Sequence, residues 1–124
     1  MMFAARKTTR FKLNSHTFNL GGSLDYELYR RVATFFKNSN LAERPLVIRR
    51  IKLKASLDGQ CEIKDGVFLI KINRNLSENY SIDVVIHEVA HAVAWDKDCD
   101  VHGPNWGRAY SKVYRLFLEN FIEN

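Results

Sequence analysis

Residues 77–95 read SENYSIDVVIHEVAHAVAW, and this stretch decides the fold. Its apolar residues recur at intervals of three and four, the spacing of a helix with a wide apolar face. They are Ile82, Val85, Ile86, Val89, Ala92 and Val93. A polar loop from Asp96 to Val101 interrupts the pattern. The sequence therefore predicts a helix from Ser77 to about Trp95.

This helix carries the motif HExxH, as His87-Glu88-Val89-Ala90-His91. Residues four apart on an α-helix are separated by about 40° around the axis and about 6 Å along it. Both imidazoles can therefore reach one metal ion, and zinc accepts such nitrogen ligands. Glu88 lies about 100° from His87, close enough to hold a water on the metal without becoming a ligand. The motif predicts a zinc site with Glu88 as the general base of a hydrolase.

A catalytic zinc usually has three protein ligands and one open position. His102 is the best third candidate, because it just precedes Pro104, which suits the first turn of a new helix. The short loop after Asp96 can return that helix to the motif. Rival ligands remain open at this point; they are Asp96, Asp98, Cys99, Asp100 and Glu119.

Other side chains near the motif are candidates to stabilise an oxyanion or to orient a ligand. Tyr110, Arg108 or Tyr114 are candidates to stabilise an oxyanion, although the tyrosines have the helical spacing of ordinary packing residues. Asp83 lies one turn before His87 and is a candidate to orient it. A solvent-facing acid near the helix N-terminus is the simpler interpretation of Asp83.

Upstream of the motif, helical spacing predicts a helix over about Leu24–Lys37, after the Gly21-Gly22 break. Three strand-like stretches follow, separated by the turn signals Asp58-Gly59 and Asp65-Gly66. They are Leu46–Ala55, Cys61–Lys64 and Val67–Asn73. We expect an α+β fold: an N-terminal helix, a three-stranded antiparallel β-meander, the HExxH helix and a C-terminal helix from Pro104.

The chain has 124 residues, of which 46% are hydrophobic and 27% charged, as in an ordinary globular domain. We expect a basic N-terminal segment, residues 1–22, and a single domain, residues 23–124. No apolar stretch approaches the roughly 18 residues that cross a bilayer, so no membrane partner is expected. The chain start lacks the apolar segment of a secretory signal. The two cysteines form no CxxC pair, which excludes a four-cysteine zinc site and favours a cytoplasmic location.

The net charge of +5 favours an anionic partner such as nucleic acid, although it also serves solubility. Arg50, Lys52 and Lys54 alternate with apolar residues in the first predicted strand, so we expect them to face solvent. They are a candidate DNA-contacting stripe. A solvated, edge-guarding face is the plainer interpretation.

From about Ile82 to Tyr114 the sequence resembles the SprT-like metallopeptidases, which include the Spartan proteases of DNA–protein crosslinks. In that family HExxH is followed by a loop and then His-Gly-x-x-aromatic, here His102-Gly103-Pro104-Asn105-Trp106. The resemblance implies zinc ligands at His87, His91 and His102 and a water-activating base at Glu88. It also implies that Trp106 packs against the third ligand and braces it.

Many members of that family carry a cysteine-rich zinc-ribbon module, which these residues lack, so crosslink repair is not transferred. Compact actinobacterial and phage proteins with a similar pattern are an equally close comparison. We expect a zinc-dependent metallopeptidase that hydrolyses peptide bonds in proteins or peptides, DNA-associated proteins among them. The alternatives are a non-catalytic zinc module that binds nucleic acid through Arg50, Lys52 and Lys54, and a metal-free interaction domain. The sequence leaves the oligomeric state open.

Overall fold

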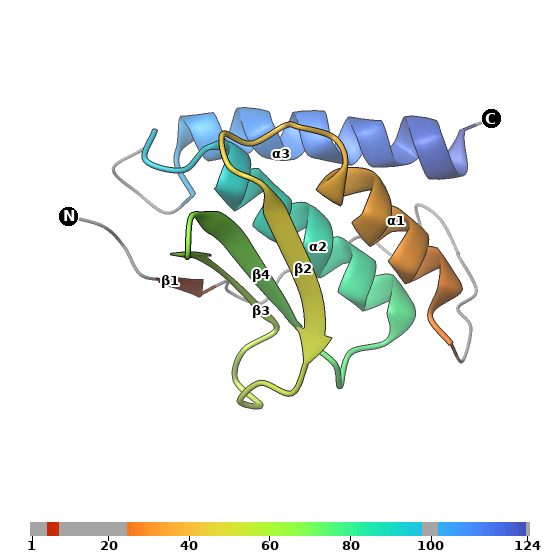
Figure 1. Ribbon diagram of the computed structural model, residues 1–124. Helices are drawn as coiled ribbons and strands as arrows, with labels where there is room; N and C mark the ends of the chain where they lie inside the picture. The colour runs from red at the N-terminus through yellow and green to blue at the C-terminus, as the bar shows by residue number, and fades with distance from the viewer. Residues whose placement is uncertain (1–4, 8–24, 98–101, 124) are drawn as a thin grey trace.

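The computed structural model describes residues 5–7, 25–97 and 102–123. After β1, a strand that the sequence did not predict, its elements follow the predicted order of helix, strands and two further helices, so the α+β class is confirmed (Figure 1). They are β1 (Ala5–Lys7), α1 (Glu27–Lys37), β2 (Leu46–Ile51), β3 (Gly59–Lys64), β4 (Val67–Asn73), α2 (Glu78–Val93) and α3 (Pro104–Phe117), with a π-helical extension, η1 (Leu118–Ile122). None of the helices in these ranges is long and apolar enough to cross a membrane.

The four strands form one sheet in the order β1-β3-β4-β2. β3 is antiparallel to β4, to which a hairpin links it, and also to β1, but β2 is parallel to β4. The predicted antiparallel meander is therefore wrong at β2. The reason lies in the connection: β2 ends at Ile51, and residues 52–58 carry the chain past the position of β4 before β3 begins. A two-residue hairpin would have forced the two strands to be neighbours.

Asn73, at the end of β4, holds this connection in place. Its side-chain amide donates hydrogen bonds to the carbonyls of Leu57 (2.8 Å) and Lys54 (3.1 Å), and its backbone N–H donates to Asp58 (2.8 Å). Asn73 is 3% exposed, so these bonds satisfy polar groups that water cannot reach. The connection is thus fixed against the sheet.

The three basic residues of the expected stripe do not all lie on the first strand. Lys52 and Lys54 are exposed but follow the last residue of β2. Arg50 is only part-exposed: its guanidinium lies 3.9 Å from the ring centroid of Tyr26 and donates to the carbonyl of Arg74 at 3.3 Å. The expectation that Arg50 faces solvent is therefore wrong, because a cation–π contact with the start of α1 holds it.

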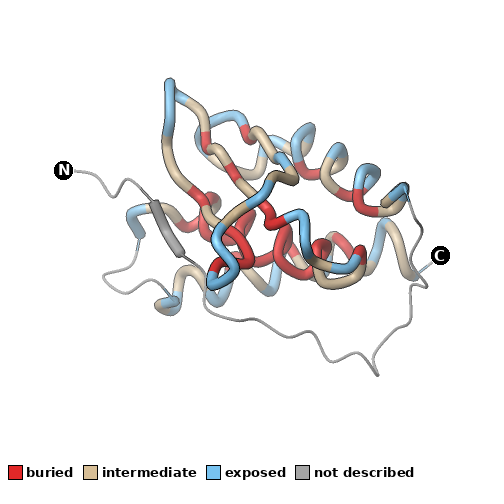
Figure 2. The backbone as a smooth tube through the Cα atoms, turned by 90° about the horizontal axis from the view of Figure 1, so that it is seen from below, coloured by how far each residue is buried: buried red, intermediate tan, exposed pale blue. Residues whose placement is uncertain are grey.

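α2 lies in the middle of the molecule, between the sheet and the helices α1 and α3 (Figure 1). Ser77 caps it, since its hydroxyl accepts the backbone N–H of Tyr80 at 3.3 Å. Every residue from Ser81 to Ala92 is buried, and the buried segments gather at the centre of Figure 2. The helix predicted from Ser77 to Trp95 is thus confirmed, with its end two residues earlier.

Candidate metal centre

Three histidines meet at the C-terminal half of α2. His87 and His91 project from α2 one turn apart, and His102 lies two residues before α3. The Nε2 atom of His87 lies 3.2 Å from Nε2 of His91 and 3.2 Å from Nε2 of His102. Nitrogens bound to one tetrahedral zinc, at about 2.0–2.1 Å each, lie about 3.3 Å apart. The three side chains therefore fit one zinc ion.

The turn between α2 and α3 brings His102 to the other two histidines. Asp96 adopts a left-handed conformation (φ 63°) just after α2 ends. In the first turn of α3, the amide of Asn105 donates to the carbonyl of Lys97 at 2.9 Å, which ties the new helix to the end of the old one. His87 and His91 are 2% and 4% exposed, whereas His102 is exposed, so the centre has one side open to solvent.

Asp96 and Glu119, the rival ligands that the structure describes, do not join this group. Within the part of the chain that the structure describes, the potential ligands that converge are the three histidines. Asp96 is exposed in the turn, and Glu119 is exposed in η1. Asp98, Cys99 and Asp100 lie outside the described residues.

Trp106 contacts the rings of all three histidines. Its ring centroid lies 4.6 Å from that of His102, 5.1 Å from His87 and 5.6 Å from His91. Tyr110 stacks on Trp106 at 5.2 Å, one further turn along α3. Trp106 is therefore the side chain that holds the imidazoles, and Tyr110 supports Trp106 from behind.

Asp83 is buried, at 4% exposure, so the expectation of a solvent-facing acid is wrong. Burial, followed by the charges of Asp83 and Tyr114, raises the pKa of Tyr110 to about 12. Asp83 thus acts at the contact between α2 and α3, next to the aromatic residues that back the metal centre. The spacing in the sequence indicates this position, because Asp83, His87 and His91 recur every four residues and therefore share one helix face.

Glu88 lies beside the histidines and is fully buried. Neither carboxylate oxygen has a hydrogen-bond partner among the described residues. Burial raises the pKa of Glu88 well above its usual range. A buried carboxylate without partners is costly, which makes Glu88 a candidate for a chemical role.

Gly59, the first residue of β3, makes room for this carboxylate. A Cβ at Gly59 would lie 3.2 Å from Oε2 of Glu88 and 2.5 Å from Cγ1 of Val84, closer than side-chain atoms pack. The sequence pattern predicts Gly59 only as a turn residue. Its second role is to let β3 pass directly against the face of α2 that carries Glu88.

The electrostatics suit metal binding. Burial, and then the nearby His102, lowers the pKa of His87 to about 3, and burial also lowers the pKa of His102. Both imidazoles are therefore neutral at pH 7, and a neutral imidazole has a nitrogen lone pair for a metal.

Comparison with known proteins agrees with this geometry. Residues 26–122, which include all three histidines and Glu88, match the SprT-like family. The chain belongs to the SprT-like family. Neither a curated protein nor a solved structure gives a significant match. This family is associated with a metallopeptidase fold, so the SprT-like domain described here is metallopeptidase-like and has a three-histidine group suited to a metal ion.

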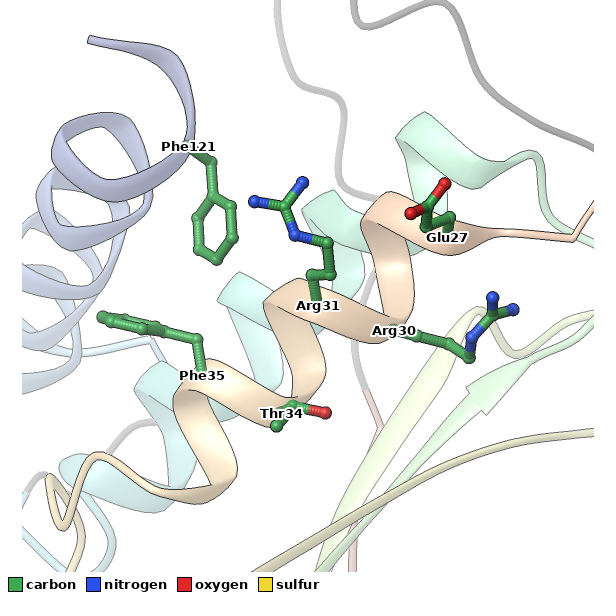
Figure 3. Close-up of a pocket in the computed structure, with 6 residues that line it drawn as sticks. All are labelled: Glu27, Arg30, Arg31, Thr34, Phe35 and Phe121. Carbon is green, nitrogen blue, oxygen red and sulfur yellow. The ribbon is translucent and has the colours of Figure 1, made fainter. Parts of the chain in front are cut away.

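A separate groove of about 410 Å³ lies between α1 and η1 of the SprT-like domain (Figure 3). Its lining residues are Glu27, Arg30, Arg31, Thr34, Phe35 and Phe121. Phe35 and Phe121 meet edge to face at 5.5 Å, and the Arg31 guanidinium lies 5.6 Å from the centroid of Phe121. No residue of α2 or of the three-histidine group lines it, so it is not part of the metal centre.

Proposed function

We propose that this SprT-like domain is a zinc-dependent peptidase in which Glu88 is the general base. The observation that carries the proposal is one arrangement: three histidine nitrogens within 4.8 Å of one another, beside a buried carboxylate on the same helix. A set of three imidazoles suits a catalytic zinc, and those of His87 and His102 are neutral at pH 7.

His87, His91 and His102 would hold the metal. A zinc ion bound there supplies Lewis acidity, which polarises a peptide carbonyl and lowers the pKa of water to about 7. Glu88 accepts the proton of the attacking water, because its raised pKa makes it a stronger base than an ordinary surface carboxylate. The same carboxyl group then delivers that proton to the leaving amine nitrogen. Trp106 keeps the three imidazole rings in position throughout.

The variant Glu88→Gln tests the proposal. Amide for carboxylate keeps the size of the side chain but removes the base. We expect the zinc-loaded variant to keep about one zinc per chain and to lose at least about 100-fold in cleavage of fluorescein-labelled casein, an unfolded protein. Glu119→Gln, at an exposed position in η1, is the matched control and keeps wild-type activity. Unchanged cleavage by Glu88→Gln would refute the assignment of the base.

We also propose that the protein substrates include DNA-associated proteins. The support is the net charge of +5, the exposed Lys52 and Lys54, and the arginines of the α1–η1 groove. A cytoplasmic location stays a prediction.

Binding of a labelled DNA duplex at 50 and 200 mM salt separates the peptidase from the alternative non-catalytic module. The DNA proposal expects affinity that falls with salt and with Lys52→Glu/Lys54→Glu. DNA binding together with casein cleavage that Glu88→Gln abolishes supports the peptidase. DNA binding without any cleavage that depends on Glu88 supports the non-catalytic module.

A further inference from the structure

The outer strand of the sheet comes from the N-terminal segment. β1 pairs antiparallel with β3, placing Ala5 opposite Glu62, Arg6 opposite Cys61 and Lys7 opposite Gln60. Figure 1 draws β1 at the edge of the sheet, on the side of the view where α3 begins. The basic N-terminal segment thus contributes backbone to the sheet.

The strand that β1 covers is the one that touches the proposed base. Gly59 begins β3, and its backbone lies against Val84 and the carboxylate of Glu88. Lys7 pairs with Gln60, the residue next to Gly59. β1 therefore runs along β3 up to the point where β3 meets the catalytic face of α2.

An extended peptide has one edge of β3 available to it. β4 occupies the inner edge over the whole length of β3, from Gly59 to Lys64. The outer edge carries the backbone groups that an added strand would use, and adding a strand at the edge of a sheet is a common mode of peptide recognition. In this structure β1 already holds that edge.

We propose that β1 is an internal competitor of the substrate: the outer edge of β3 receives the substrate peptide as an extended strand, and β1 covers that edge until the peptide displaces it. The inference rests on the proposed peptidase function. β1 is three residues long, so it offers only a few backbone hydrogen bonds. A longer peptide that pairs along all of β3 can replace it.

Proline substitutions in the full chain test this competition. Hydrogen bonds in an antiparallel pair alternate, so either Arg6→Pro or Lys7→Pro removes a backbone donor to β3. The matched variants Arg6→Ala and Lys7→Ala remove the same charges and keep the backbone N–H. We expect one proline variant to cleave casein with a kcat/KM about five-fold higher, mainly through a lower KM, while the alanine variants stay near wild type. The free decapeptide MMFAARKTTR, residues 1–10, should slow the faster variant again.

A binding measurement in the Glu88→Gln background separates this inference from the peptidase proposal, because it needs no hydrolysis. We expect labelled casein to bind the effective proline variant more tightly than its alanine control, and the β3 amides to exchange hydrogen faster in that variant when no casein is present. If casein binds a proline variant more tightly but no variant, with or without Glu88, cleaves it, the peptidase proposal is refuted and the competition between β1 and the peptide stands. Unchanged or weaker binding in both proline variants would overturn the competition, and weaker binding would place the substrate on β1 instead.

Discussion

At the scale of single residues, Gly59 is a position where a larger side chain does not fit without a shift. Gly59→Ala forces a Cβ to 2.5 Å from Val84 and 3.2 Å from the Glu88 carboxylate, so the strand or the helix must shift. We expect a loss of about 1–3 kcal/mol in the free energy of unfolding, measured by urea titration, and a fall in casein cleavage.

Gly107→Ala is the control for that change. Gly107 lies in α3, and a Cβ there meets nothing within 4 Å, so alanine should stabilise the helix by up to about 1 kcal/mol. Equal effects of the two glycine substitutions would contradict the close approach of β3 to Glu88.

Trp106 is expected to set the strength of metal binding. Its ring contacts all three histidines, so Trp106→Leu should free the imidazoles to move and weaken zinc binding by about 10–100-fold, measured by competition with a chelator. Trp95→Leu is the control, since Trp95 packs on Phe68 at 5.3 Å. Wild-type affinity in Trp106→Leu would show that the ring does not hold the ligands.

The titration of His87 predicts how the metal-free protein responds to acid. In the unfolded chain this histidine takes up a proton below about pH 6.5, whereas in the folded protein burial keeps its pKa at about 3. Between these values the unfolded state binds more protons, so lowering the pH reduces the free energy of unfolding, by up to about 1.4 kcal/mol per pH unit. The lowered pKa of His102 acts in the same direction.

Glu88 acts in the opposite direction, because its raised pKa lets the folded state keep a proton that the unfolded state has lost. The measurement therefore uses metal-free Glu88→Gln, with urea unfolding at pH 7, 6 and 5. Adding His87→Asn should make the fall in stability shallower. An identical pH slope with and without His87 would contradict its assignment as a buried neutral group.

At the scale of elements, the start of α2 depends on its cap. Ser77 accepts the backbone N–H of Tyr80, so Ser77→Ala should lower the free energy of unfolding by about 1 kcal/mol. Ser111→Ala, at an exposed position within α3, is the control and should change stability little. A thermal unfolding scan compares the two, and equal melting temperatures would contradict the cap.

The helices could be predicted because their signals are local. Ser77 and the apolar spacing of α2, and Pro104 at the first position of α3, each mark an element within a few residues. The parallel pairing of β2 with β4 is a long-range property. It depends on residues 52–58 and on the buried bonds of Asn73, which no alternation of apolar and polar residues reveals.

The histidines and the glutamate of the candidate metal centre could also be predicted, because their signals are local in the sequence. Some of the residues that support them could not. His87, Glu88 and His91 follow from helix geometry, and the structure brings His102 to them across a short turn. The buried position of Asp83 and the close approach of Gly59 were not predicted. A helix that is buried on nearly every side has no polar face from which the solvent side can be read.

At the scale of the whole molecule, the proposed catalytic residues and the strand proposed to cover the substrate edge come from different stretches of the chain. The family match covers residues 26–122, with every proposed ligand and the base. β1 lies before that match and closes the edge of the sheet beside Glu88. The proposed chemistry thus belongs to the family domain, and the proposed competitor to the N-terminal segment.

The central claim is that three histidines hold a zinc ion, and the zinc content of the purified, tag-free chain tests it most directly. Elemental mass spectrometry should find about one zinc per chain in the wild type and a large loss in His91→Ala, while the control Glu119→Gln keeps its metal. A folded wild-type protein that holds no zinc, even after zinc is offered in excess, would contradict the claim.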